Sequence, residues 1–211
     1  DTVTNMDTFR TLRCHGMLSC FPKHLNKQWL DAPDIPVDLL DTDYYALSCG
    51  IKEHDVKTLF NLLSKLKDNY INPLFICVDV ANGYLCDFLK TCYEIRKKLP
   101  NVVLIAGNVV TPEGVRDVIM DGTADVVKVG IGSGQLCTTR KVAGVGYPQF
   151  SAVLECAEKA HDLGAHIISD GGLQVVGDFS KAYGAGADFV MSGSMFAGHD
   201  ESAGEVIMDN S

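Results

Sequence analysis

The sequence lacks the features that mark membrane proteins, secreted proteins and nucleic-acid-binding proteins. No segment of the 211 residues approaches the roughly 18 unbroken apolar residues of a transmembrane helix. Basic residues are few, because 18 Lys and Arg face 27 Asp and Glu, and the net charge of −9 argues against nucleic acid as a partner. Asp1–Met6 lacks the basic-then-apolar order of a signal peptide. We therefore expect no membrane and no nucleic acid among the partners.

Paired-cysteine motifs are also absent. The eight cysteines form no C-x-x-C pair, and a chain of this length does not need disulfides to hold its core together. Reduced thiols and a cytoplasmic location are the simplest expectation. The composition, 46% apolar with 20 glycines and only 7 prolines, excludes a disordered or collagen-like chain.

Short apolar runs that end at glycine or small polar residues recur along the chain. Their near-continuous apolar character predicts strands buried on both faces, as in a parallel sheet. Five such runs are Leu74–Val80, Val102–Ala106, Val126–Val129, Ile167–Ser169 and Phe189–Met191. Three further candidates are Met17–Phe21, Tyr44–Ser48 and Asp1–Met6, the last as the tail of a first strand.

Amphipathic stretches between these runs predict helices. They are Asp55–Lys67, Asp87–Lys98, a helix that Thr111 caps and Gly122 ends in a left-handed conformation, and Phe150–Leu163. Eight strand candidates at a period of roughly 25 residues favour an α/β fold of the (β/α)8 TIM-barrel type. A doubly wound sheet would alternate in the same way, but eight units favour the closed barrel. Residues 1–211 are then a single barrel domain.

One connection is much longer than the others and rich in glycine. It follows the run Val126–Val129 and places Cys137, Thr139 and Arg140 among five glycines. A thiol on such a loop, with an arginine nearby, can have a lowered pKa and act as a nucleophile, and a hydroxyl two residues on can move a proton. The alternative is a flexible surface loop with an incidental thiol.

Two glycine turns follow the last two predicted strands. Asp170-Gly171-Gly172 ends one strand and Gly193-Ser194 ends the next. Backbone amides at these positions commonly hold a phosphate in TIM barrels, and Asp170 would be free to accept hydrogen bonds from ribose hydroxyls. The alternative is two ordinary turns.

Four segments carry a family resemblance that extends from Thr4 to Ser202. They are G-I-G-S-G-Q-L-C-T-T-R-K-V-A-G-V-G-Y-P-Q (130–149), D-V-A-N-G-Y (79–84), A-G-N-V-V-T (106–111) and S-D-G-G (169–172). The chain resembles the GMP reductases, which belong with the IMP dehydrogenases. The form of residues 79–84 and the short stretch from Lys23 to Asp43 favour the reductase, whereas Gly193-Ser194 is more similar to the dehydrogenase.

The resemblance implies a reaction and a site. GMP would be reductively deaminated to IMP and ammonia with NADPH, through a thioimidate on Cys137, with Thr139 assisting proton transfer. Asp170 would bind the ribose, and Gly171, Gly172, Gly193 and Ser194 the phosphate. Residues near the nicotinamide nucleotide would be Lys23, Asp79, Val80, Ala81, Ile131 and Gly132. A monovalent cation, K⁺, would lie among Gly132, Gly134, Cys137 and Arg140, and the assembly would be a homotetramer.

Compared with the family pattern, the sequence starts within the first strand and stops just after the eighth. The flap, the last helix and a glutamate that assists the threonine are not in it, so the resemblance implies a barrel incomplete at both ends. Two other functions stay open: an IMP dehydrogenase relative, and a non-catalytic purine-nucleotide binder without the flap.

Overall fold

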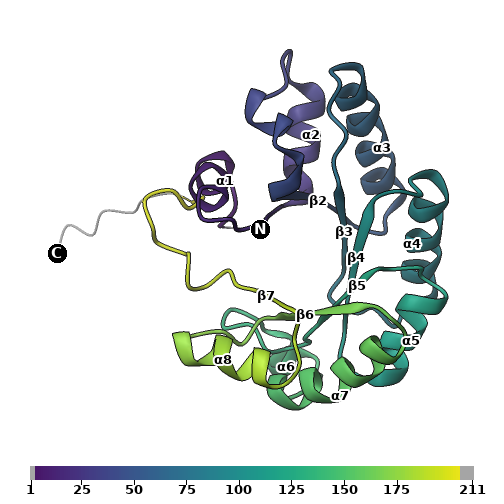
Figure 1. Ribbon diagram of the computed structural model, residues 1–211, viewed down its shortest axis with the longest axis vertical. Helices are drawn as coiled ribbons and strands as arrows, with labels where there is room; N and C mark the ends of the chain where they lie inside the picture. The colour runs from purple at the N-terminus through teal and green to yellow at the C-terminus, as the bar shows by residue number, and fades with distance from the viewer. Residues whose placement is uncertain (1–2, 205–211) are drawn as a thin grey trace.

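Seven parallel strands form one sheet in the computed structural model, which describes residues 3–204. The strands pair in chain order, and the sheet curls into an open half-barrel with helices on its outside (Figure 1). They are β1 (Ser19–Phe21), β2 (Tyr45–Cys49), β3 (Phe75–Asp79), β4 (Val103–Val109), β5 (Val126–Val129), β6 (His166–Asp170) and β7 (Phe189–Met191). All seven carboxyl ends therefore lie along one rim, where barrels of this type carry their ligands.

Helices connect the strands and cover the outer face of the sheet. They are α1 (Met6–Arg13), α2 (Lys23–Asp31), α3 (Glu53–Asp68), α4 (Cys86–Lys98), α5 (Pro112–Met120), α6 (Thr139–Val142), α7 (Gln149–Asp162) and α8 (Val176–Gly184). Two 3-10 turns, Val37–Leu40 and Thr42–Tyr44, precede β2. No helix in this described part of the chain is long and apolar enough to cross a membrane.

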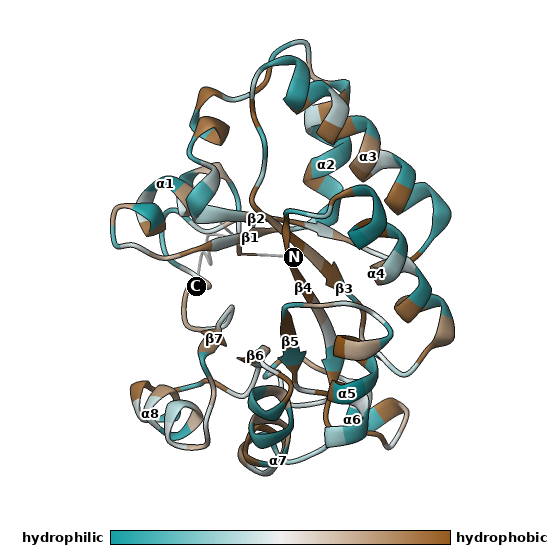
Figure 2. Ribbon diagram, turned by 45° about the vertical axis from the view of Figure 1, so that its right-hand side comes forward, coloured by the Kyte–Doolittle hydropathy of each residue, from teal (hydrophilic) through white to brown (hydrophobic). Residues whose placement is uncertain are grey.

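The central strands are largely hydrophobic along their length (Figure 2), and their successive residues alternate between two packed clusters. On β5, Val127 and Val129 belong to the large outer cluster between sheet and helices. Val126 belongs instead to a small inner cluster that also contains Cys77 and Ile168. Lys128 is therefore the next inward-facing position after Val126, closer to the carboxyl rim.

The predicted barrel architecture is confirmed for seven of the eight strand candidates, but the first candidate, Asp1–Met6, is wrong where it can be judged. Val3–Asn5 forms no strand, and α1 begins at Met6. The reason is local: the side chain of Asn5 accepts a hydrogen bond from the Thr8 N–H at 2.8 Å and caps the helix. Asp1 and Thr2 lie outside the described residues.

The end of α5 also differs from the prediction. Thr111 caps the helix as expected, accepting from the Gly114 N–H at 3.2 Å. The helix ends at Met120, and the left-handed residue is Thr123, with φ of 60°, rather than Gly122. Gly122 instead permits close packing, because a Cβ there would lie 2.6 Å from the carbonyl oxygen of Val118.

The segment that follows β7 crosses the open side of the half-barrel and reaches α1 (Figure 1). The N–H of Ala203 donates to the carbonyl of Val3 at 2.9 Å, and the hydroxyl of Thr8 donates to the carbonyl of Glu201 at 2.7 Å. These bonds join the two ends of the described chain across the gap between β7 and β1.

Candidate functional site

The loop between β5 and α7 carries Cys137 directly before the short helix α6, which the sequence did not predict. The N–H of Cys137 donates to the Gly134 carbonyl at 3.0 Å, and its Sγ lies 3.2 Å from Oγ1 of Thr139. The side-chain hydroxyl and then the backbone N–H of Thr139 lower the pKa of this thiol. The Gly132 N–H and Arg140 add to the effect, and partial burial opposes it. The thiolate is the reactive form of cysteine, so this loop favours a nucleophile.

Three other cysteines have the opposite environment. Cys49, Cys92 and Cys156 are buried, and burial raises the pKa of each thiol to about 12. They are core side chains that carry little thiolate at neutral pH, which distinguishes Cys137 from them.

The same loop folds back on itself through Arg140. Gly132 has φ of +77°, and a Cβ on it would lie 2.8 Å from Cγ of Arg140. The guanidinium of Arg140 donates to the carbonyl of Tyr147 at 2.6 Å. The structure thus keeps the four residues predicted for K⁺ within one folded loop. In residues 3–204 no three His, Cys, Asp or Glu side chains form a metal-binding group.

The Cys137 loop packs against the turn that follows β6. Gly171 has φ of +86°, and a Cβ on it would lie 2.7 Å from Oγ of Ser133 and 3.1 Å from the backbone nitrogen of Gly134. The Ser133 hydroxyl donates to the Asp170 carbonyl at 3.1 Å. The predicted nucleophile loop and the predicted ribose carboxylate are therefore neighbours at the rim.

The two predicted phosphate turns also lie together. Gly172 has φ of +76°, and the next residue, Leu173, accepts a hydrogen bond from the Ser194 hydroxyl at 3.1 Å. Since only a residue without a side chain adopts such φ values readily, the two consecutive glycines keep this turn tight. Ser194 thus contacts the residue that directly follows Gly171 and Gly172.

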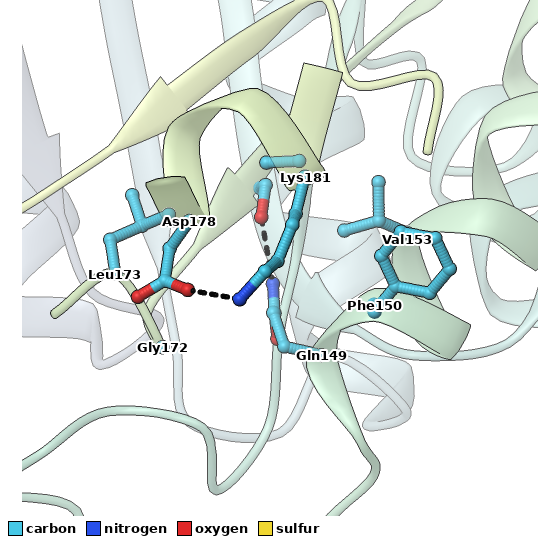
Figure 3. A pocket seen from close by; sticks show the side chains of 9 residues that line it. Gln149, Phe150, Val153, Gly172, Leu173, Asp178 and Lys181 are labelled. Atoms are coloured by element: carbon cyan, nitrogen blue, oxygen red, sulfur yellow. Dashed lines mark hydrogen bonds and ion pairs between the residues drawn. The ribbon is translucent and has the colours of Figure 1, made fainter. Parts of the chain in front are cut away.

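A cavity of about 230 Å³ lies between α7 and α8, behind this turn (Figure 3). Gln149 and Gly172 line one part of it, and the ion pair of Lys181 with Asp178, 3.0 Å long, lines another. Neither Cys137 nor Ser194 lines it, so the cavity borders the turn after β6 and not the cysteine loop.

Only some of the residues predicted near a nicotinamide nucleotide lie close together at the rim. Asp79 ends β3 and pairs with Lys128, while Val80 and Ala81 continue along the rim. The side chain of Ile131 is buried. Lys23 lies at the β1 side of the sheet, where its ammonium pairs with Asp55 at 3.1 Å. The Lys23 ammonium therefore bonds to Asp55 and to none of the other predicted site residues.

Two polar residues at the centre of the site were missed by the sequence prediction. Lys128 contacts Asp79 and Asp170, and the amide Nδ2 of Asn108 donates to Asp170 Oδ2 at 2.9 Å and to the Gly130 carbonyl at 2.7 Å. A charged residue inside the apolar run V-V-K-V was the available signal for Lys128.

The parallel half-barrel, with a glycine-rich cysteine loop packed against an acidic glycine turn at its carboxyl rim, places the chain in the class of (β/α)-barrel proteins. A family model described as IMP dehydrogenase / GMP reductase domain matches residues 47–211, and the chain belongs to this family.

Its relatives carry the reductase name. The chain is 45% identical over 211 residues to GMP reductase 2 of Bos taurus, covering 100% of this chain and 59% of that one. It is 47% identical to GMP reductase of Phytophthora infestans, covering 100% of this chain and 56% of the other. The chain thus spans somewhat more than half the length of these relatives.

The solved structures agree with this assignment. A cysteine-to-alanine variant of GMP reductase from Trypanosoma brucei, in complex with guanosine 5'-monophosphate, superposes with a TM-score of 0.73 at 36% identity. The match covers 81% of this chain and 35% of that one.

Proposed function

We propose that residues 1–211 are the barrel domain of a GMP reductase, which converts GMP to IMP and ammonia with NADPH. The observation that carries this proposal is the 3.2 Å contact of Cys137 Sγ with Thr139 Oγ1, on a loop packed against the Asp170 turn. An aromatic carbon that bears an amine is a poor electrophile. A soft thiolate and a proton-transferring hydroxyl at the same carbon meet that difficulty.

The covalent step begins when the Cys137 thiolate adds to C2 of the purine. The amino group takes up a proton with help from Thr139, and the C2–N bond then breaks so that ammonia leaves. This leaves a thioimidate on Cys137. NADPH, when bound, supplies the hydride that reduces C2, after which the C–S bond breaks and the sulfur leaves again as thiolate.

The rim supplies the binding groups for the nucleotide. Asp170 accepts hydrogen bonds from the ribose hydroxyls, and uncovered backbone amides hold the phosphate. These amides belong to Gly171, Gly172, Gly193 and Ser194. The adjacency of the two turns through the Ser194–Leu173 hydrogen bond supports this assignment.

The nicotinamide nucleotide would lie against Asp79, Val80, Ala81, Ile131 and Gly132. Asp79 has a half-exposed side chain and Ala81 is exposed at the same rim, which fits a ligand that approaches from solvent. Lys23 has the least support among the proposed cofactor residues, because its ammonium is held by Asp55.

A monovalent cation fits the Cys137 loop better than a transition metal does. The predicted residues Gly132, Gly134, Cys137 and Arg140 offer backbone carbonyls, which suit K⁺. Zn²⁺ and similar ions need clustered His, Cys or carboxylate side chains, and residues 3–204 contain no such group of three. The homotetramer rests on the family resemblance, and light scattering of the full chain tests it.

Absorbance at 340 nm tests the function with the full-length protein that carries this barrel domain. We expect NADPH to be consumed with GMP, with one ammonia released per NADPH, and K⁺ to raise the rate. IMP dehydrogenase is the second candidate because Gly193-Ser194 is similar to the dehydrogenase motif, and it predicts formation of NADH from IMP and NAD instead. Binding of GMP with neither reaction would indicate a non-catalytic binder.

A further inference from the structure

A buried charge at the mouth of the barrel has no role in the reaction steps above. Lys128 faces inward from β5, and its side chain is only 4% exposed. Its Nζ lies 3.1 Å from Oδ2 of Asp170 and forms a second ion pair with Oδ1 of Asp79. One ammonium thus joins the carboxylates that end β3 and β6.

The groups that contact the Lys128 ammonium carry more negative charge than it carries positive charge. Burial lowers the pKa of Lys128, but Asp170, Cys77 and Asp79 together raise it well above its ordinary value. Cys20 of β1 faces the same region, and its hydrogen bond with Cys77 and the charge of Lys128 lower the pKa of its thiol. One positive charge therefore balances two carboxylates. Apolar residues could fill this buried position, because replacing a buried ion pair by apolar residues often costs no stability. Packing alone therefore does not explain a lysine at position 128.

The two carboxylate oxygens of Asp170 have different contacts. Lys128 Nζ and Asn108 Nδ2 both contact Oδ2, at 3.1 Å and 2.9 Å. Among residues 3–204, no hydrogen bond or ion pair reaches Oδ1, and the side chain is 23% exposed. Two donors on one oxygen fix the plane of the carboxylate and leave the other oxygen to a ligand.

We propose that Lys128 is a positioning residue of the nucleotide site, which orients Asp170 so that Oδ1 faces a ribose hydroxyl. Asn108 contacts the same oxygen, Oδ2, and Asp79 shares the ammonium. The identity of the ligand rests on the proposed function, but the orientation of Asp170 concerns the unliganded chain alone.

The consequence of removing the ammonium follows from the two carboxylates. Asp79 and Asp170 both contact Nζ, so without it they would face each other without a counter-charge. Like charges at such a distance repel each other, so the Asp170 carboxylate would turn away from Asp79 and Oδ1 would no longer face the ribose. The affinity for the ribose hydroxyls would therefore fall, while the contacts to the rest of the nucleotide would remain.

The experiment uses the full chain as wild type, Lys128→Met and the double variant Lys128→Met/Asp79→Asn. Crystal structures of the three proteins without nucleotide report the direction of Asp170 Oδ1, and calorimetry at one pH measures the affinity of each for GMP and for 2′-deoxy-GMP. We expect the Asp170 side chain of Lys128→Met to turn away from its wild-type direction. This variant should lose about tenfold in GMP affinity, the worth of about one hydrogen bond to a charged group, and much less in 2′-deoxy-GMP affinity. The double variant should regain most of the GMP affinity, because it lacks the second carboxylate.

An unmoved Asp170 side chain in Lys128→Met, or equal losses of affinity for GMP and 2′-deoxy-GMP, would overturn the proposal. If Lys128→Met does not fold, the double variant should fold and hold Asp170 in its wild-type direction, and its failure to do so would also overturn the proposal. Wild type that binds no GMP would instead refute the proposed function, while the structures without nucleotide still decide the role of Lys128.

Discussion

Selective alkylation of Cys137 is the sharpest consequence of its environment. Cys49, Cys92 and Cys156 have pKa values of about 12, so only about one molecule in ten thousand carries each thiolate at pH 8. The pKa of Cys137 lies below the ordinary value of 9.0 for a thiol, so more than about one molecule in ten is ionised there.

The rate advantage is smaller than the thiolate ratio. A thiolate of lower pKa is intrinsically less nucleophilic, with a Brønsted slope of about 0.4–0.5, so a thousandfold ratio becomes a rate ratio of about 30 to 60. Burial of the other three thiols increases this ratio further. We therefore expect Cys137 to react at least about 30 times faster than these three with a limiting pulse of iodoacetamide.

Thr139→Val removes the hydroxyl that most lowers the pKa of Cys137. A hydrogen bond to a charged group contributes about 1.5–3 kcal/mol, but solvent screening at this partly exposed loop places the effect at the low end, about threefold in rate. Thr138→Val is the matched control, because Thr138 makes no side-chain capping hydrogen bond on the same loop.

Peptide mass spectrometry after timed quenching measures all of these rates in one sample. The reasoning is refuted if Cys137 reacts no faster than the exposed Cys14 and Cys86. It is also refuted if Thr139→Val and Thr138→Val leave Cys137 equally reactive.

Three further predictions concern binding and stability. Asp170→Asn should weaken GMP binding by about 1.5–3 kcal/mol and 2′-deoxy-GMP binding much less, since the carboxylate is proposed to hold ribose hydroxyls; equal losses in calorimetry would mean that Asp170 only supports its loop. Gly107→Ala should lower the free energy of unfolding by about 1–3 kcal/mol, because the added Cβ would lie 2.5 Å from Cβ and the carbonyl oxygen of Lys128. The control Gly177→Ala in α8 meets nothing within 4 Å and should not destabilise the protein. Equal urea midpoints for the two variants would contradict this prediction. Asp178 accepts hydrogen bonds from the Gln174 and Val175 N–H groups, which with Lys181 lower its pKa to about 2. Its stabilisation of α8 is therefore present above the ordinary pKa of 3.8 and is lost as the pH falls toward 2. The difference in unfolding free energy between wild type and Asp178→Ala should shrink over that pH range, and a constant difference would contradict the assignment.

The strands and the Cys137 loop could be predicted from sequence because their signals are local. A buried parallel strand is a short apolar run, and a long glycine-rich connection stands out in a compact barrel. The parallel order then places Asp170 beside that loop without any further information. The first strand candidate failed because the local signal of Asn5 as a helix cap was not used.

The polar centre of the site could not be predicted in the same way. Lys128 and Asp79 are 49 residues apart in sequence, and their contact depends on which residues of β3 and β5 face inward. Periodicity does not fix the facing of a strand that is apolar on both sides. The Lys23–Asp55 ion pair, across 32 residues, is hidden for the same reason.

The central claim is that Cys137 forms the covalent bond to the purine, and mass spectrometry of the full chain quenched during turnover with GMP tests it directly. We expect a purine-nucleotide adduct on the peptide that contains Cys137, and neither adduct nor NADPH consumption in Cys137→Ala, which should still bind GMP. An adduct on another cysteine, or undiminished NADPH consumption by Cys137→Ala, would contradict the account.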